Sequence, residues 1–268
     1  MHSYKVVIPA RHASTRLPGK PLLRIAGKAM LQWVYEHACA AQAEEVLIAT
    51  DDERIATAAR AFATPATAVI MTSATHASGT DRVAEVARIR GWPEGQIVVN
   101  VQGDEPLLPP QLVRQVALLL GQYPQADIAT LATPVTSLAD FLDPNVVKVV
   151  ADASQRALYF SRAPIPWLRD SAAAGLQSQT QWQGAQRHIG LYAYRVGALQ
   201  RMAALPSSAL ETAEKLEQLR ALEAGFDIRV AGSELPPGPD VNTADDLERA
   251  GALLVAPQAG IPVFGRGR

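Results

Sequence analysis

Short apolar stretches alternate with helical patterns through the first hundred residues of the chain. Four stretches rich in Val, Ile and Ala predict strands at residues 5–8, 45–49, 68–71 and 96–101. Between the first two, apolar residues at helical spacing predict a helix over residues 30–41 that packs on the sheet. This alternation is typical of an α/β fold, in which helices cover both faces of a mostly parallel sheet.

The second half of the chain changes character after a predicted amphipathic helix at residues 111–123. Strands are predicted at residues 127–133, 146–150, 157–160 and 188–194, joined by loops rather than long helices, so the sheet is expected to become mixed here. Residues 170–184 are poor in apolar side chains and read as a mobile or partner-contacting insert. Further helices are predicted at residues 212–224 and after Thr243, a natural N-cap.

The composition is that of a folded chain with a large core. The 268 residues are 48% hydrophobic, enough for one extended α/β domain or two modest ones. We expect a single domain over residues 1–255, followed by a tail at residues 256–268 to which no role is assigned. The single cysteine excludes an intrachain disulfide and a cysteine-clustered zinc site.

Charge and hydropathy exclude two classes of partner. The net charge of −1 and the pI of about 6.5 leave no global basic field, so no nucleic-acid partner is expected. The chain shows neither an apolar signal segment nor a run of membrane-spanning length. We therefore expect no membrane insertion and a cytoplasmic location.

The loop that follows the first strand has the composition of a polyphosphate site. Pro9 lacks a backbone donor, so strand pairing is expected to stop there. Small residues let backbone N–H groups approach a ligand, and Arg11, Arg16 and Lys20 supply positive charge for a triphosphate. A solvated surface loop is the alternative. The motifs GxxxxGK[ST] and GxGxxG are absent, which argues against a P-loop kinase and a standard dinucleotide dehydrogenase.

Two further loops follow predicted strands. In the segment HASGTDR, Ser78 or Thr80 can cap the next helix, and we expect the segment to be both a cap and part of the site. Asp104 follows the strand at residues 96–101, whose carboxyl end should face the same crevice as the basic loop. It could be a turn residue. Its position favours a Mg²⁺ ligand, because magnesium binds one or two carboxylates together with substrate phosphates.

Several motifs, in order, resemble those of the 3-deoxy-manno-octulosonate cytidylyltransferases. They are IPARHASTRLPGKPL, HASGTDR and VNVQGDEPLLPP, and the resemblance runs from about Tyr4 to about Leu254. It implies a three-layer, Rossmann-like nucleotidyltransferase fold with a smaller subdomain, at about residues 134–200, for sugar binding and homodimer contacts. It also implies transfer of CMP from CTP to 3-deoxy-D-manno-octulosonate (Kdo), with release of pyrophosphate and formation of CMP-Kdo for lipopolysaccharide biosynthesis.

The resemblance also implies which residues form the site. The nucleotide would be bound by Pro9, Ala10, Arg11, Arg16, Lys20, Ser78, Gly79, Thr80, Arg82 and Gln102. The sugar would be bound by Gln102, Arg162, His188, Tyr192, Glu217 and Gln218. The expected catalytic residues are Arg11 and Lys20, which would neutralise the triphosphate, and Asp104. Three of these have a plain alternative: His188 and Tyr192 could be core polar groups, and Arg162 could pair with a surface carboxylate.

The chain departs from the family at the second metal position. The family has an aspartate just before the last helix, but Asn242 stands there, with Asp240 two residues earlier. Asp104 and Asn242 are therefore the expected Mg²⁺ ligands, with Asp240 or Asp245 as alternatives for the second. Open alternatives for the function are a cytidylyltransferase for another acidic sugar, such as sialic acid or 8-amino-Kdo, an enzyme that couples a different nucleotide to a neutral sugar, and a nucleotide sensor without turnover.

Overall fold

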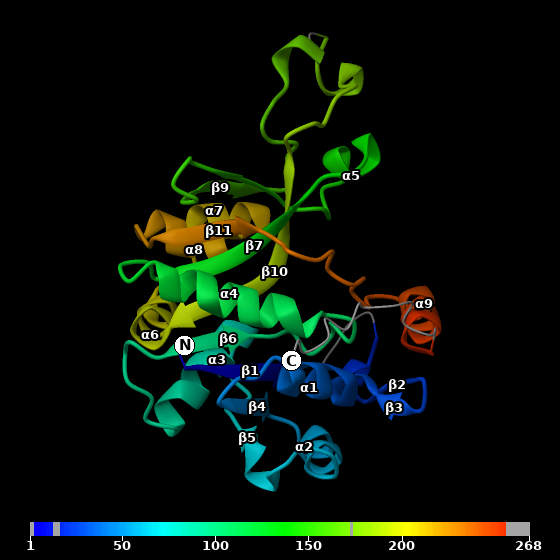
Figure 1. The fold of residues 1–268 in the computed structure, drawn as a ribbon, viewed down its shortest axis with the longest axis vertical. Helices are drawn as coiled ribbons and strands as arrows, with labels where there is room; N and C mark the ends of the chain where they lie inside the picture. The colour runs from blue at the N-terminus through cyan, green and yellow to red at the C-terminus, as the bar shows by residue number, and fades with distance from the viewer. Residues whose placement is uncertain (1–2, 13–16, 172–173, 256–268) are drawn as a thin grey trace, which may run out of the picture.

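A nine-stranded sheet forms the centre of the protein (Figure 1). The computed structural model describes residues 3–12, 17–171 and 174–255. Seven strands lie in the order β11-β7-β10-β6-β1-β4-β5, and β8 pairs with both β10 and β9 beside them. The strands are β1 (Tyr4–Ala10), β4 (Glu45–Thr50), β5 (Val69–Met71), β6 (Ile97–Asn100), β7 (Ile128–Pro134), β8 (Lys148–Ala151), β9 (Ala157–Ser161), β10 (Gln186–Arg195) and β11 (Ile228–Gly232).

The strand directions confirm a mostly parallel sheet with a mixed part. β1 is parallel to β4 and β6, β4 is parallel to β5, and β7 is parallel to β11. The long strand β10 lies between β6 and β7 and is antiparallel to both. The other six strands of the main path therefore end at one edge, where ligands of open α/β sheets bind.

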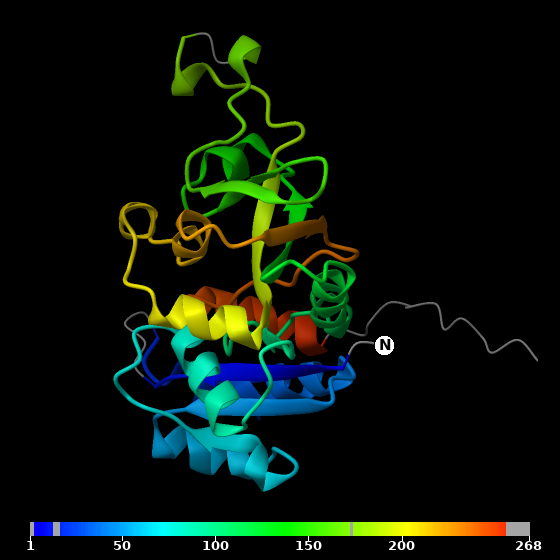
Figure 2. The ribbon, with the colours of Figure 1, turned by 90° about the vertical axis from the view of Figure 1, so that its left-hand side faces the viewer.

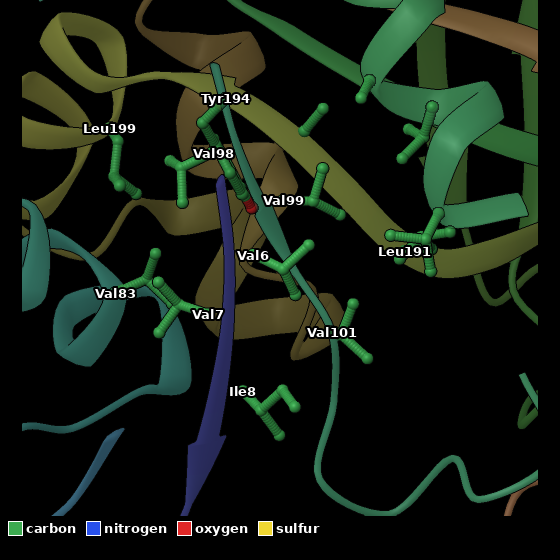
Figure 3. Close-up of a cluster of buried hydrophobic side chains, with 14 of the residues drawn as sticks. Val6, Val7, Ile8, Val83, Val98, Val99, Val101, Leu191, Tyr194 and Leu199 are labelled. Carbon is green, nitrogen blue, oxygen red and sulfur yellow. The ribbon is translucent and has the colours of Figure 1, made fainter. Parts of the chain in front are cut away.

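Helices cover both faces of the sheet, which gives the expected three layers. Figures 1 and 2 show α4 on one face and α3 with α6 on the other; α1 packs beside α4. In the core, Val7 and Val98 point toward Val83 of α3 and Leu199 of α6 (Figure 3). The helices are α1 (Met30–Ala40), α2 (Glu53–Arg60), α3 (Gly79–Ile89), α4 (Pro110–Gln122), α5 (Leu138–Leu142), α6 (Val196–Ala204), α7 (Ala209–Glu214), α8 (Gln218–Glu223) and α9 (Ala244–Val255).

Strand β1 is longer than the sequence predicts, so the expectation that pairing stops at Pro9 is wrong. Its pairing with β4 continues through Pro9 and Ala10. The N–H of Val101 donates to the carbonyl of Val7 at 3.1 Å, so the backbone N–H and C=O of Val7 point toward β6. Residues two apart on a strand point their backbone groups to the same side, so the backbone nitrogen of Pro9 also points toward β6. Because β6 ends at Asn100, the missing N–H of Pro9 removes no ladder bond.

The predicted helix over residues 212–224 is also wrong, since two short helices replace it. Ser208 forms a capping box with Glu211 and starts α7 before the predicted position. Lys215 then adopts a left-handed conformation (φ 54°) that ends α7, and α8 begins at Gln218. The break changes the direction of the chain just before Glu217.

Smaller elements complete the fold. They are the hairpin strands β2 (Arg24–Ile25) and β3 (Lys28–Ala29) and the 3-10 turns η1 (Lys20–Leu22), η2 (Ala66–Ala68), η3 (Arg169–Ser171) and η4 (Leu176–Ser178). The chain between β9 and β10 projects from the sheet at the top of Figure 1 and exposes Trp167 and Leu176. No helix within the described ranges is long and apolar enough to cross a membrane. The tail at residues 256–268 lies outside the described residues, and the single-domain boundary stays a prediction.

Candidate active site

The loops after β1, β5 and β6 meet at the carboxyl edge of the sheet, and two glycines permit the approach. A Cβ atom on Gly103 would lie 3.0 Å from the carbonyl oxygen of Pro9. One on Gly79 would lie 3.2 Å from Cγ of Pro9. A side chain at either position would push these loops apart. The three segments that carry the predicted nucleotide residues are thus brought together.

Lys20 is the centre of a polar cluster at this edge. It is the first residue of η1, and its Nζ donates to Oδ2 of Asp104 at 2.6 Å and to Oδ1 of Asn242 at 3.4 Å. The side chain of Lys20 is only 10% exposed, whereas that of Asp104 is 40% exposed. The cation is therefore fixed within the protein, while the carboxylate is open to a ligand.

A tight backbone crossing brings Asn242 to this cluster. A Cβ atom on Gly238 would lie 2.4 Å from Cβ of Leu107, so only glycine lets the two chains pass there. Three residues later, the N–H of Val241 donates to the carbonyl of Asp104 at 3.3 Å. Of the alternative metal ligands, Asp240 lines a small cavity with Glu105, and burial followed by the charge of Asp104 raises the pKa of Asp240. Asp245 is exposed in the first turn of α9.

The donor set at this cluster fits magnesium held together with a substrate. Asp104 and Asn242 offer a carboxylate and an amide oxygen, both within hydrogen-bonding distance of one amine. Among the described residues no group of three or more His, Cys, Asp and Glu side chains is arranged to hold a metal ion, so protein ligands alone do not form a metal site here. Mg²⁺ commonly uses one or two protein ligands plus phosphate oxygens, so a triphosphate would supply the remaining ligands.

A cavity of about 280 Å³ is lined by Gln102, two residues before Asp104 of the cluster. Five of the six predicted sugar residues line it, together with residues from α3, β6, α6 and the α7–α8 connection. Its lining is Thr80, Asn100, Gln102, His188, Gly190, Tyr192, Tyr194, Met202, Leu216, Glu217 and Gln218. This mixture of aromatic rings, polar side chains and the carboxylate of Glu217 suits a molecule rich in hydroxyls.

Glu217 joins the cavity to the predicted nucleotide segment. Its carboxylate accepts hydrogen bonds from Ser78 Oγ at 3.1 Å and Thr80 Oγ1 at 3.0 Å, and it pairs with Arg220 at 3.1 Å. Burial raises the pKa of Glu217, although the two hydroxyl donors oppose that shift. Ser78 is also the N-cap of α3, in a capping box with Asp81, which confirms the expected cap; the expected part of the segment in the nucleotide site stays a prediction.

His188 and Tyr192 lie side by side on one face of β10. Their ring centroids are 5.2 Å apart, and Phe160 packs edge-on against His188 at 5.0 Å. Burial lowers the pKa of His188 to about 3, so the ring is neutral at physiological pH. The hydroxyl of Tyr192 is buried without a hydrogen-bond partner, and it lines the cavity. An unpaired buried hydroxyl in a polar cavity is suited to bind a ligand.

The depressed pKa of His188 predicts an acid-sensitive fold. The unfolded chain binds a proton at this residue below a pKa of about 6.5, whereas the folded protein does so only near 3, so stability falls as the pH falls through this window. Between pH 6.5 and 4.5 we expect the free energy of unfolding of the wild type to drop by about 2 kcal/mol more than that of His188→Gln. Urea unfolding at both pH values measures the difference; parallel pH dependences would contradict it.

Three of the predicted arginines do not line the cavity, and the fourth falls outside the described residues. Arg162 lies at the end of β9, where its side chain donates to the carbonyls of Glu214 and Pro144 at 2.6 and 2.9 Å. Arg82 is buried and pairs with Asp51 at 3.0 Å, which ties α3 to the loop after β4. Arg11 is exposed after β1. Arg16 lies outside the described residues.

Asn100 and Tyr194 are cavity residues that the sequence reasoning missed. The sequence places both residues in predicted strands and indicates no ligand for either, yet both line the cavity and are almost fully buried. A usable signal was present for Asn100, because an amide at the end of an apolar strand needs a polar partner. Tyr194 gave no such signal, since a tyrosine in a strand is ordinary.

The fold and the site define an α/β nucleotidyltransferase, with a lysine–carboxylate cluster and a polar cavity at the carboxyl edge of the sheet. The chain belongs to the cytidylyltransferase family, whose sequence model, described as Cytidylyltransferase, matches residues 5–228.

Relatives similar over nearly the full length carry one name. A 3-deoxy-manno-octulosonate cytidylyltransferase of Thioalkalivibrio sulfidiphilus is 54% identical over 254 residues, covering 95% of this chain and 100% of the relative. Proteins of that name from Xanthomonas euvesicatoria and Cellvibrio japonicus are also 54% identical, over 95% and 94% of this chain and 97% and 98% of their own lengths.

Solved structures agree on the fold. A CMP:2-keto-3-deoxy-manno-octonic acid synthetase complexed with CTP has a TM-score of 0.83 at 43% identity, covering 94% of this chain and 98% of that one. A 4-diphosphocytidyl-2C-methyl-D-erythritol synthase, at 13% identity, has a TM-score of 0.61 and covers 95% of this chain and 99% of that one. At that identity the second likeness shows the shared fold alone.

Proposed function

We propose that this protein transfers CMP from CTP to Kdo, releasing pyrophosphate and forming CMP-Kdo for lipopolysaccharide assembly. The observation that carries the proposal is that the Lys20–Asp104–Asn242 cluster is joined through Gln102 to a cavity lined by five predicted sugar residues, since Gln102 lines the cavity and stands two residues before Asp104. The name common to relatives at 54% identity supports the choice of substrates, as does the CTP complex of the similar solved structure.

The chemistry is an in-line displacement at phosphorus. The anomeric hydroxyl of the sugar attacks the α-phosphate of CTP and gives up its proton to solvent, a new P–O bond forms, and the bond to the bridging oxygen of pyrophosphate breaks. Lys20, held in a buried pair, would place a fixed positive charge beside the triphosphate, and Arg11 would add a second from the loop. Catalysis then consists mostly of positioning and charge stabilisation, and no side chain is assigned as a general base.

Asp104 and Asn242 would hold Mg²⁺ at this place. The ion would offset charge on the phosphoryl oxygens and lower the pKa of a hydroxyl that it binds. Asn242 contributes an oxygen without a charge, so the site carries one negative charge less than a pair of aspartates would.

A substrate panel tests the proposed function. CTP, UTP, ATP and GTP are each combined with Kdo, 8-amino-Kdo and sialic acid, and pyrophosphate release is followed with Mg²⁺ present. We expect the CTP–Kdo pair to react fastest. Preference for another sugar would reassign the acceptor, and preference for another nucleotide would reassign the donor. CTP binding by calorimetry without any metal-dependent product would indicate a nucleotide sensor instead.

A homodimer and a cytoplasmic location belong to the same proposal. Trp167 and Leu176 are 46% and 51% exposed on the projecting chain between β9 and β10, within the region expected to make dimer contacts. Large exposed apolar side chains on a projection suit burial against a second copy. Sedimentation is expected to give twice the 28.6 kDa mass of the chain, and Trp167→Asp is expected to shift it toward the single-chain mass. CTP, the proposed donor, is supplied in the cytoplasm.

A further inference from the structure

A fully buried threonine holds an irregular part of β10 in place. The pairing of β10 with β7 shifts register between Ile189 and Tyr192, where β10 carries two extra residues. Thr130 of β7 lies opposite this bulge and is 0% exposed. Its Oγ1 contacts the carbonyl oxygens of Leu191 at 2.8 Å and Ile189 at 3.1 Å, and it contacts Nε2 of His188 at 3.0 Å.

The three contacts fix where the protons lie. A threonine hydroxyl has one proton to donate, and carbonyl oxygens can only accept. If Thr130 gave its proton to His188, its oxygen would face two carbonyl oxygens within 3.1 Å with no hydrogen between them. The proton therefore goes to the carbonyls, and Nε2 of His188 must be the donor to Thr130.

The neutral state of His188 completes the assignment. A neutral imidazole carries one N–H, so protonation at Nε2 leaves Nδ1 as an acceptor. The ring cannot easily turn, because Phe160 packs edge-on at 5.0 Å and Tyr192 lies at 5.2 Å. His188 also lines the cavity, as do the other predicted sugar residues apart from Arg162. A ligand thus meets this residue as a hydrogen-bond acceptor that repels carboxylates and accepts from hydroxyls.

We infer that Thr130 is a positioning residue that holds His188 in the tautomer protonated at Nε2, so that Nδ1 accepts a hydrogen bond from a hydroxyl of the bound sugar. The identity of the ligand rests on the proposed function, whereas the tautomer does not. The carboxylate of an acidic sugar would accordingly bind elsewhere in the cavity, at groups that donate hydrogen bonds.

The tautomer is measured directly by ¹H–¹⁵N spectra of histidine-labelled protein without substrate. The wild type is expected to show the protonated nitrogen of His188 at Nε2. Thr130→Val, which removes the hydroxyl and nearly keeps the shape, is expected to lose that single state, and Thr130→Ser is expected to retain it. A wild-type proton at Nδ1 would overturn the inference, and so would an unchanged tautomer in Thr130→Val. This measurement stands even if the chain proves inactive toward Kdo.

Kinetics supply the second measurement. We expect Thr130→Val to raise the KM for the sugar about threefold to tenfold, the loss expected for one neutral hydrogen bond, with the KM for CTP unchanged. Thr130→Ser should stay near the wild type. If the role of Thr130 were purely structural, Thr130→Val would lower kcat and thermal stability together and would not raise the KM for the sugar selectively. That pattern would also overturn the assignment.

Discussion

Asp104→Asn is expected to lower the turnover number by about 100-fold or more while leaving the fold intact. The substitution keeps the shape of the side chain but removes the charge that pairs with Lys20 at 2.6 Å. Because the neighbouring candidate ligand, Asn242, is also an amide, the variant would offer a metal ion two amide oxygens and no carboxylate. Such a pair binds Mg²⁺ poorly. Pyrophosphate release at saturating CTP and Kdo measures the effect.

Asp52→Asn is the matched control for this variant. Asp52 follows β4 as Asp104 follows β6, and it pairs with Arg54 at 2.6 Å on the surface. Because asparagine is an equally good N-cap for α2, the control should fold and turn over like the wild type. Calorimetry adds a readout without turnover: chelation of Mg²⁺ should weaken CTP binding to the wild type but change it little in Asp104→Asn. A variant within a few-fold of wild-type turnover would remove Asp104 from the mechanism.

Lys20→Ala is expected to lower kcat by about 100-fold to 1,000-fold, with a smaller change in the KM for CTP. The amine of Lys20 is held by two side chains and cannot follow the substrate, so its charge is best placed for the transition state rather than for initial binding. An interaction made mainly in the transition state lowers kcat when it is removed. Steady-state kinetics over a full range of CTP concentrations separate the two constants.

Lys5→Ala is the control for the lysine variant. Lys5 lies near the start of β1, the strand that precedes the loop to Lys20, and it pairs with Glu44 at 2.8 Å far from the carboxyl edge. Its loss should leave both kinetic constants near their wild-type values. If Lys20→Ala keeps its kcat at saturating CTP and only raises KM, Lys20 is a binding residue and has no part in the chemical step.

The parallel half of the fold could be predicted from hydrophobic pattern alone. The runs around Val6, Ile48 and Val99 are buried on both faces of the sheet, so burial and sequence carry the same signal. The start of α3 could be predicted because a capping residue, Ser78, marks it in the sequence. The break at Lys215 could not be predicted, because no glycine or proline marks it and the local pattern still favours a helix.

The candidate site was predictable in part. Residues placed by the strands could be predicted, whereas the partners of long side chains could not. Lys20, Asp104 and His188 follow or occupy strand segments, and strand topology dictates that such positions converge. The partners of Arg82 and Arg162 could not be judged from sequence. A long guanidinium side chain can reach a ligand, a carboxylate or backbone carbonyls. Arg82 and Arg162 reach protein groups here, and only coordinates reveal which.

The position of β10 has a consequence for the order in which the protein can be made. β5, β4, β1 and β6 are all synthesised within the first hundred residues and can pair with one another at once. β7 pairs only with β10 and β11, which leave the ribosome at least fifty residues later. We expect a nascent chain to bury Lys20 against Asp104 early and to remain without its sugar cavity until β10 pairs with β6 and β7. This pairing joins segments far apart in the sequence and is therefore intrinsically slow.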